Sequence, residues 1–304
     1  MNKDSKINIS FILILAMLAV STSPVAAKIL NQGGNVDGVM LAFWRMSLAC
    51  LLLWLFSFIK KQGSFNDREN LKITILSGFF LGLHFACFFI ALDLTKMANA
   101  AFLGTLTPIF TLVLEICILK RRCSRWVYVG VAFALLGALI IFLGSPLDYE
   151  NNDMRGNFFA LICSLILAIS FLISERVRKK EDTIVYTRTL YGSAGITLLF
   201  LALILQRNIF PYENHVFLFS GFVYLGLVPT IVGHNAFYYS LRYVKPTIVA
   251  TVPLAEPIVA SVIGYFLFPF FAMQNELFTD PWYYTVIGGL VSLIGIFLVI
   301  RNKK

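Results

Sequence analysis

The sequence contains little charge and few residues with reactive side chains. Charged residues make up 13% of its 304 positions, and it has five cysteines and three histidines. So little charge is atypical of water-soluble domains of this length. The cysteines form no Cys-x-x-Cys pair and the histidines have no metal-ligand spacing, so we expect neither a metal site nor a disulfide framework. A Walker loop and a recognisable nucleophilic triad are also missing, so we expect no ATP-driven pump and no cofactor.

The sequence is instead rich in apolar residues, which amount to 59% of the chain, with a mean hydropathy of +0.81. A helix needs about 20 mainly apolar residues to span a bilayer, and runs of that length recur along the whole chain. The pattern predicts an all-α integral membrane protein with ten transmembrane helices. The expected spans are residues 9–30, 38–59, 71–92, 98–119, 126–144, 156–175, 183–205, 216–241, 247–268 and 282–300.

The charges between the spans predict the orientation. If the N-terminus is cytoplasmic, nineteen lysines and arginines fall in inner segments and three in outer loops. Cytoplasmic loops of membrane proteins carry such an excess. The segments 146–154 and 275–280, which hold acidic residues, would then lie outside. We therefore expect both termini to be cytoplasmic in an inner cell membrane. The net charge of +9 suits contact with anionic lipid and requires no nucleic acid.

The chain also contains an internal duplication. Residues 91–108 align without gaps on 240–257, residues 43–55 align on 186–198, and GALIIFLG (137–144) is similar to GIFLVI (295–300). The matches divide the chain into two units, 9–144 and 156–300, of five spans each. Because five is odd, the second unit enters the membrane from the opposite side. Inverted repeats of this kind surround a midplane site in transporters that work by alternating access.

These features resemble the EamA-type drug/metabolite transporters. Each unit has an arginine early in its second span and an AL-x-x-T/V-x-x-x-x-A run leading into a proline-containing helix, TLTP or LAEP. The resemblance implies that spans 1, 3, 4, 6, 8 and 9 surround a central cavity, with spans 5 and 10 at the periphery. The family often has an LGE turn after its fourth and ninth helices, whereas this chain has LKRR (119–122) and FPFFAMQNELF (268–278).

A glutamate lies between two prolines in the ninth span, VPLAEPIVAS (252–261). A carboxylate at membrane depth is costly and usually faces a cavity or a partner. Pro253 and Pro257 interrupt the backbone hydrogen bonds, which makes them candidate hinges. Glu256 is either a substrate- or proton-binding carboxylate or a protonated side chain that holds the kink. Thr107 takes its place in the first unit and is a candidate for substrate binding.

The fourth span has its own polar face. Gly104, Pro108 and Glu115 fall at helical spacing, with Pro108 as a candidate hinge. Glu115 lies about one turn from the cytoplasmic end. It either binds substrate or pairs with Lys120 or Arg122.

Two histidines occupy nearly equivalent places in spans three and eight. His84 and His234 are within one position of each other in the repeat alignment, and Asn235 and Tyr238 follow the second histidine. All four are candidates for substrate binding. Histidine changes charge nearest neutral pH, so the pair allows proton coupling, whereas the alternative is two packed, hydrogen-bonded side chains.

Arg45 and Arg188 pair in the repeat alignment, each about two turns into its span. Either they face the cavity and bind a substrate carboxylate, or they extend toward lipid headgroups, as long basic side chains do.

Together the residues and the resemblance predict a secondary transporter, and the resemblance favours export of amino acids or related metabolites. The expected partners are a small-molecule substrate and membrane lipid, and a homo-oligomer is left open. The alternatives from other classes are an intramembrane enzyme, which would need clustered acids or histidines, and a membrane scaffold, which would normally carry a soluble domain. We therefore expect no catalytic residues.

Overall fold

The structure is a computed structural model that describes residues 8–33, 36–95, 97–144, 153–210, 214–267 and 283–302. Every regular element in these ranges is helical. Ten helical segments are long and apolar enough to cross a membrane, so the predicted all-α fold and its ten spans are confirmed. The expected outer segment 275–280, the divergent stretch 268–278 and most of 146–154 lie outside the described residues.

Six spans are unbroken helices. Several begin at an aspartate or serine whose side chain accepts a hydrogen bond from the first turn, as Asp37 does from the Val39 amide at 2.7 Å. These caps fix where each chain segment enters the apolar layer. The six helices are α3 (Gly38–Ile59), α4 (Arg68–Leu94), α7 (Arg125–Leu143), α8 (Met154–Arg178), α9 (Thr183–Ile204) and α15 (Tyr283–Arg301).

The other four spans are broken within the membrane. They consist of α1 (Ile9–Val20) and α2 (Thr22–Gly33); α5 (Met97–Gly104) and α6 (Thr107–Cys117); α10 (His215–Leu225), the π-helix η1 (Gly226–His234) and α11 (Asn235–Ser240); and α12 (Pro246–Thr251), the 3₁₀ turn η2 (Val252–Ala255) and α13 (Glu256–Leu267).

Proline explains each break. The helices α1, α5 and α10 end four residues before Pro24, Pro108 and Pro229 respectively, and Pro253 lies within η2. Proline has no N–H to donate to the carbonyl four residues earlier, and its ring clashes with that carbonyl. Broken helices at membrane depth are tolerated where they are buried in protein or border water.

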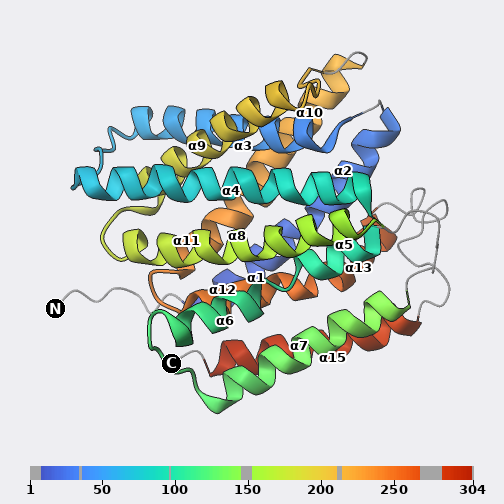
Figure 1. The fold of residues 1–304 in the computed structure, drawn as a ribbon. Coiled ribbons are helices and arrows are strands. Elements are labelled where there is room, and N and C mark those ends of the chain that lie inside the picture. The colour runs from blue at the N-terminus through green and yellow to red at the C-terminus, as the bar shows by residue number, and fades with distance from the viewer. Residues whose placement is uncertain are drawn as a thin grey trace.

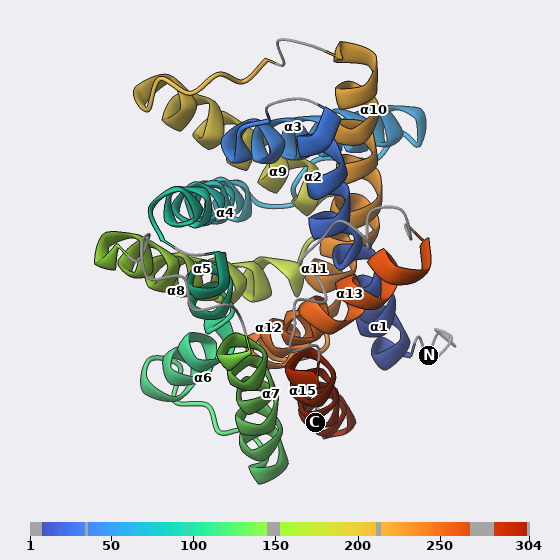
Figure 2. The same ribbon diagram turned by 90° about the vertical axis from the view of Figure 1, so that its right-hand side faces the viewer.

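The helices pack in pairs that follow the inverted repeat (Figures 1 and 2). Span 3 (α4) lies along span 6 (α8), and the equivalent span 8 (η1 and α11) lies along span 1 (α1). Spans 5 and 10 (α7 and α15) pack against each other at one edge. Their backbones meet at glycines, because a β-carbon on Gly137 would lie 2.3 Å from the carbonyl oxygen of Gly288. Small residues allow this close approach between membrane helices.

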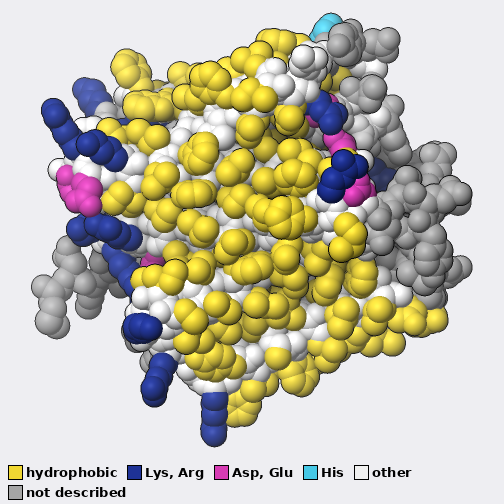
Figure 3. Space-filling view, viewed as in Figure 1, with side chains coloured by type: hydrophobic (Ala, Val, Ile, Leu, Met, Phe, Trp, Pro, Cys, Tyr) yellow, Lys and Arg dark blue, Asp and Glu magenta, His cyan; other side chains and the backbone are white. Residues whose placement is uncertain are grey.

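Positive charge gathers at one end of the bundle. Figure 3 shows lysine and arginine side chains along one edge and hydrophobic side chains over the surface beside it. We call this the basic end. It is where the loops after α3, α6, α8 and α11 lie (Figure 1). By their positions in the sequence, these loops contain Lys60, Lys61, Arg121, Arg122, Lys179, Lys180 and Arg242.

Candidate functional site

Arg45 lies at the centre of the helix bundle. The side chain comes from α3 and is 9% exposed. Its Nε donates to the Thr230 hydroxyl at 2.7 Å and its Nη1 donates to the Ser23 hydroxyl at 3.2 Å. The guanidinium lies over the ring of Phe85, with 5.4 Å between Cζ and the ring centroid. These contacts come from spans 8, 1 and 3, so three helices hold the arginine in one orientation.

Thr230 lies in the π-helix of span 8, and a hydrogen bond within this helix orients its hydroxyl for the contact with Arg45. Pro229 has no N–H to donate to the carbonyl of Leu225 four residues earlier, and the Thr230 hydroxyl donates to that carbonyl at 2.8 Å. Because its own proton is used there, the hydroxyl presents an acceptor to Arg45. The proline break and the position of the arginine are therefore linked.

One nitrogen of Arg45 remains available. Its Nη2 is buried and has no hydrogen-bond partner among the described residues. Glu256, half-buried at the start of α13, is close enough for electrostatic attraction to Arg45. The two side chains are nevertheless not within ion-pair distance in the described part of the chain. Arg45 and Glu256 thus lie in the same region without forming an ion pair with each other among the described residues.

The two predicted histidines flank the same aromatic ring. The ring centroids of His84 and His234 lie 5.1 and 6.4 Å from that of Phe85. The His84 Nδ1 lies 3.0 Å from the carbonyl oxygen of Cys163, whereas the His234 Nδ1 is buried without a hydrogen-bond partner among the described residues. The structure therefore brings His84, His234, Arg45 and Glu256 into one region.

Asn235 and Tyr238 form the side of this region toward the basic end. The Tyr191 hydroxyl donates to Asn235 Oδ1 at 2.7 Å. Tyr238 is fully buried and packs against Phe171, Tyr186 and Tyr191. These tightly packed rings separate the central polar groups from the basic end.

The predicted hinge residues lie at the breaks in spans 4 and 9. Pro108 is in the first turn of α6, Pro253 is in η2 and Pro257 follows Glu256 in the first turn of α13. Thr107 begins α6, and its buried hydroxyl has no hydrogen-bond partner among the described residues. Its position is equivalent to that of Glu256 in the repeat.

Arg188 lies away from the centre, toward the basic end. Its Nη2 donates to the Gly63 carbonyl at 2.6 Å, and its guanidinium stacks on Trp54 with 4.1 Å to the ring centroid. It is therefore an arginine held by a loop carbonyl and an aromatic ring. Its repeat counterpart, Arg45, is the one at the centre.

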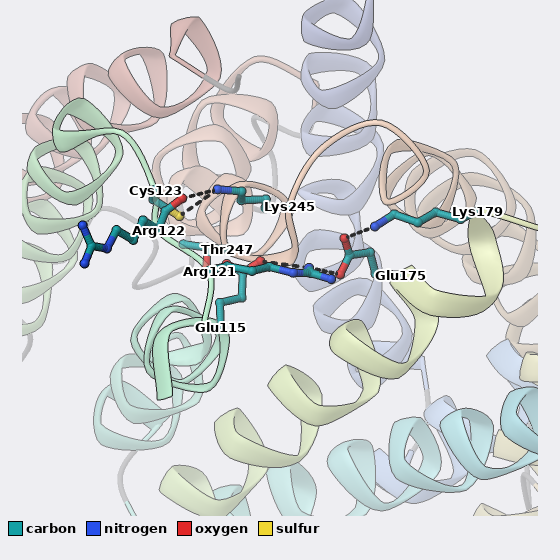
Figure 4. A network of polar contacts seen from close by, with 8 residues as sticks. All are labelled: Glu115, Arg121, Arg122, Cys123, Glu175, Lys179, Lys245 and Thr247. Carbon is teal, nitrogen blue, oxygen red and sulfur yellow. Dashed lines mark hydrogen bonds and ion pairs between the residues drawn. The ribbon is translucent and has the colours of Figure 1, made fainter. Parts of the chain in front are cut away.

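Glu115 is also remote from the central region. It lies at the basic end, where Thr247 donates to its Oε2 and Arg121 approaches its Oε1 to 3.9 Å (Figure 4). Its basic neighbour is thus Arg121, rather than either of the two basic residues that the sequence suggested.

Sequence reasoning missed four residues of the central region, namely Ser23, Phe85, Thr230 and Tyr191. Thr230 directly follows Pro229, and a hydroxyl beside a proline within a span is a usable signal for a satisfied helix break. Tyr191 is one turn beyond Arg188 on α9, and nothing in its local sequence distinguishes it from a packing residue. Among the described residues no group of three or more histidine, cysteine or acidic side chains could hold a metal ion.

The helices around the central region separate into two groups away from the basic end. There α2 packs with α13, and α5 packs with α8. Among the described residues, neither α2 nor α13 packs extensively against α5 or α8 (Figure 2). Toward the basic end, α12 contacts α6 and α8, and α11 contacts α1 and α8. The bundle is therefore closed at the basic end.

The chain matches known proteins over nearly its whole length. The model of the EamA-like transporter family matches it twice, over residues 8–143 and 154–301. An uncharacterized transporter of Archaeoglobus fulgidus is 24% identical over 297 residues, covering 96% of this chain and 97% of that one. The Pseudopaline exporter CntI of Pseudomonas aeruginosa is 23% identical over 294 residues, with 96% of each chain covered. A crystal structure with a TM-score of 0.74 and 16% identity covers 97% of this chain and 99% of that one, which shows a shared fold.

Proposed function

Because the chain belongs to the EamA-like transporter family, we propose that it is a secondary transporter that exports small polar or amphipathic metabolites, such as amino acids, by alternating access. Its family and named relatives identify it as a transporter, and its ten apolar helices as a multi-pass membrane protein. The substrate class, the direction and the mechanism are our proposal.

One observation carries the proposed substrate class. Arg45 is buried at the centre of the bundle, its Nη2 has no hydrogen-bond partner among the described residues, and it is close enough for electrostatic attraction to half-buried Glu256. Charged groups inside a membrane protein are costly, and they mark substrate or ion pathways. A zwitterion matches this pair, because its carboxylate can accept from Arg45 while its ammonium donates to Glu256. The Phe85 ring beneath the guanidinium adds an apolar surface for the rest of the molecule.

The proposed movement uses the two halves of the chain, 9–144 and 156–300. The described state is closed at the basic end, and rocking of the halves would close the other end and open this one. The breaks at Pro108, Pro253 and Pro257 let the helices bend while their segments stay rigid. Glu256, helped by the two histidines, is our candidate for carrying a coupling proton.

The proposed setting is a cytoplasmic membrane with the basic end inside. This orientation follows from the excess of lysine and arginine at that end. The name of one relative, an exporter, supports outward transport. Lipid surrounds the apolar face.

Reconstitution tests the proposal. Purified protein in liposomes should move at least one labelled amino acid or nucleoside from a screened panel faster than protein-free liposomes, and the movement should saturate with concentration. A panel in which only compounds without a carboxylate move would refute the zwitterion proposal while leaving transport intact. Absence of protein-dependent movement across the panel would contradict the proposed substrate class altogether.

A further inference from the structure

Glu115 joins the two halves of the chain at the basic end. It belongs to α6 in the first half and is fully buried. Its Oε2 accepts a hydrogen bond from the hydroxyl of Thr247, which lies in the first turn of α12 in the second half (Figure 4). A buried carboxylate needs such partners, because leaving it unpaired costs several kcal/mol. The contact therefore favours a state in which spans 4 and 9 touch at this end.

Arg121 makes a second connection between the halves. Its Nη1 lies 2.6 Å from Glu175 Oε2 on α8 and 3.9 Å from Glu115 Oε1. Lys120 has a left-handed backbone, with φ of 53°, and the Arg121 amide donates to the Glu115 carbonyl at 2.9 Å. This turn folds the loop back beneath α6. One arginine thus bridges a buried acid of each half.

Two further contacts involve this region. Lys179 lies 2.7 Å from the second carboxylate oxygen of Glu175, one turn earlier in the same half. Lys245 donates to the Arg122 carbonyl at 2.6 Å. The Lys245 contact is a third connection between the halves. At the opposite end, by contrast, α2 and α13 do not pack extensively against α5 and α8 among the described residues.

We propose that Glu115, Arg121, Glu175 and Thr247 form a basic-end lock that holds the transporter closed at this end. The inference rests on the proposed alternating-access cycle, and it assigns Glu115 to gating rather than to substrate binding. Opening the basic end requires spans 4 and 9 to separate, which breaks the contact between Glu115 and Thr247. It also requires α8 and the loop after α6 to part, which breaks the pair between Arg121 and Glu175.

Weakening the lock should shift the population toward the state open at the basic end. A hydrogen bond to a charged group is worth enough to change a two-state equilibrium by about tenfold or more. Glu115→Gln removes the charge and keeps an acceptor for Thr247. Arg121→Gln leaves Thr247 and Glu115 together and removes the bridge to Glu175. The two substitutions therefore test separate parts of the lock.

Thr251 provides a reporter behind the lock. It is fully buried, it lies one turn from Thr247 on α12, and its hydroxyl donates to the Thr247 carbonyl at 2.7 Å. Thr251→Cys is a small change, and its thiol becomes accessible when spans 4 and 9 separate. Cys123, a thiol near Lys245 whose pKa burial raises, is replaced by serine so that its labelling does not disturb the lock.

The experiment follows labelling of this cysteine with a bulky, charged maleimide in the full-length protein in nanodiscs, using mass spectrometry of the peptide. We expect the labelling rate to rise about tenfold in the Glu115→Gln and Arg121→Gln backgrounds. The matched control is Glu69→Gln, which removes an acid of the exposed pair with Arg176 at the same end and should leave the rate unchanged.

Maleimide labelling rates within about twofold of the parent in both lock variants, with thermal midpoints unchanged, would overturn the proposed lock. If Glu115→Gln fails to accumulate, Arg121→Gln alone decides, because Arg121 is partly exposed and its loss leaves no new cavity in the core. Labelling needs no substrate, so failure of the lock is distinguishable from failure of the proposed transport.

Discussion

Replacing Thr230 with valine should weaken substrate binding through Arg45. Valine keeps the shape of threonine and removes its hydroxyl. That hydroxyl accepts from Arg45 Nε at 2.7 Å and donates to the Leu225 carbonyl at 2.8 Å. The guanidinium would retain only its hydrogen bond to Ser23, at 3.2 Å, and its contact with the Phe85 ring. It could then rotate away from the position in which Nη2 faces the central region.

The size of the effect follows from the lost hydrogen bonds. A bond to a charged group contributes about 1.5–3 kcal/mol, and about 1.4 kcal/mol is a tenfold change in affinity. Because Ser23 still accepts a hydrogen bond from Nη1, we expect a loss of binding free energy in the lower part of this range. The apparent KM should then rise about tenfold. Loss of the hydrogen bond from the hydroxyl to the Leu225 carbonyl should also lower the free energy of unfolding by about 1 kcal/mol.

The assay is transport of an amino acid by reconstituted protein, with thermal unfolding measured in parallel. Thr230→Ser keeps the hydroxyl and should restore most of the affinity. Thr187→Val is the matched control, because Thr187 is equally buried and its hydroxyl donates only to the Thr183 carbonyl of its own helix. A Thr230→Val protein with the parental KM would refute the idea that this hydroxyl orients Arg45 for substrate.

Three further predictions concern the hinge, the packing and the orientation. Glu256→Gln should abolish or uncouple transport without lowering the amount of folded protein, and Glu256→Asp should retain part of the activity; normal transport with an unchanged pH profile would make Glu256 a structural residue. Gly288→Leu should lower the free energy of unfolding by about 1–3 kcal/mol, because a β-carbon at this position would lie 2.5 Å from the Gly137 carbonyl oxygen. Gly63→Ala should leave stability unchanged, because a β-carbon there meets nothing within 4 Å. Equal thermal midpoints for the two variants would contradict this prediction. Cysteine labelling should find residues 176–182 on the cytoplasmic side and 146–154 outside, and the reverse would overturn the orientation.

Hydropathy was enough to locate all ten spans, because a span must be apolar along its whole length whatever it packs against. The breaks in spans 4 and 9 were also predictable from Pro108 and Pro253. The same reasoning applies to Pro24 and Pro229, where the helices end four residues earlier, but nothing in the local sequence predicts that span 8 widens into a π-helix. Within that π-helix, the Thr230 hydroxyl bonds both a backbone carbonyl and an arginine of another span.

The site was only partly predictable, because sequence gives the depth of a residue but not the direction it faces. Arg45 and Arg188 are equivalent in the repeat, yet one meets Thr230 and Ser23 at the centre and the other meets Trp54 and a loop carbonyl. Among the described residues, equivalent helices of the two halves therefore have different neighbours. That asymmetry arises from contacts between residues far apart in the chain, which no local pattern records.

In the proposed mechanism, the buried Arg45 recognises the carboxylate of the substrate. The most direct measurement compares transport of one amino acid with competition by its amide, in the parent and in Arg45→Gln. We predict that the amide, which lacks the carboxylate charge, competes at least about tenfold more weakly than the acid in the parent, and that Arg45→Gln raises the KM for the acid and removes this discrimination. Equal competition by acid and amide in the parent, or undiminished discrimination in Arg45→Gln, would show that Arg45 does not recognise the carboxylate.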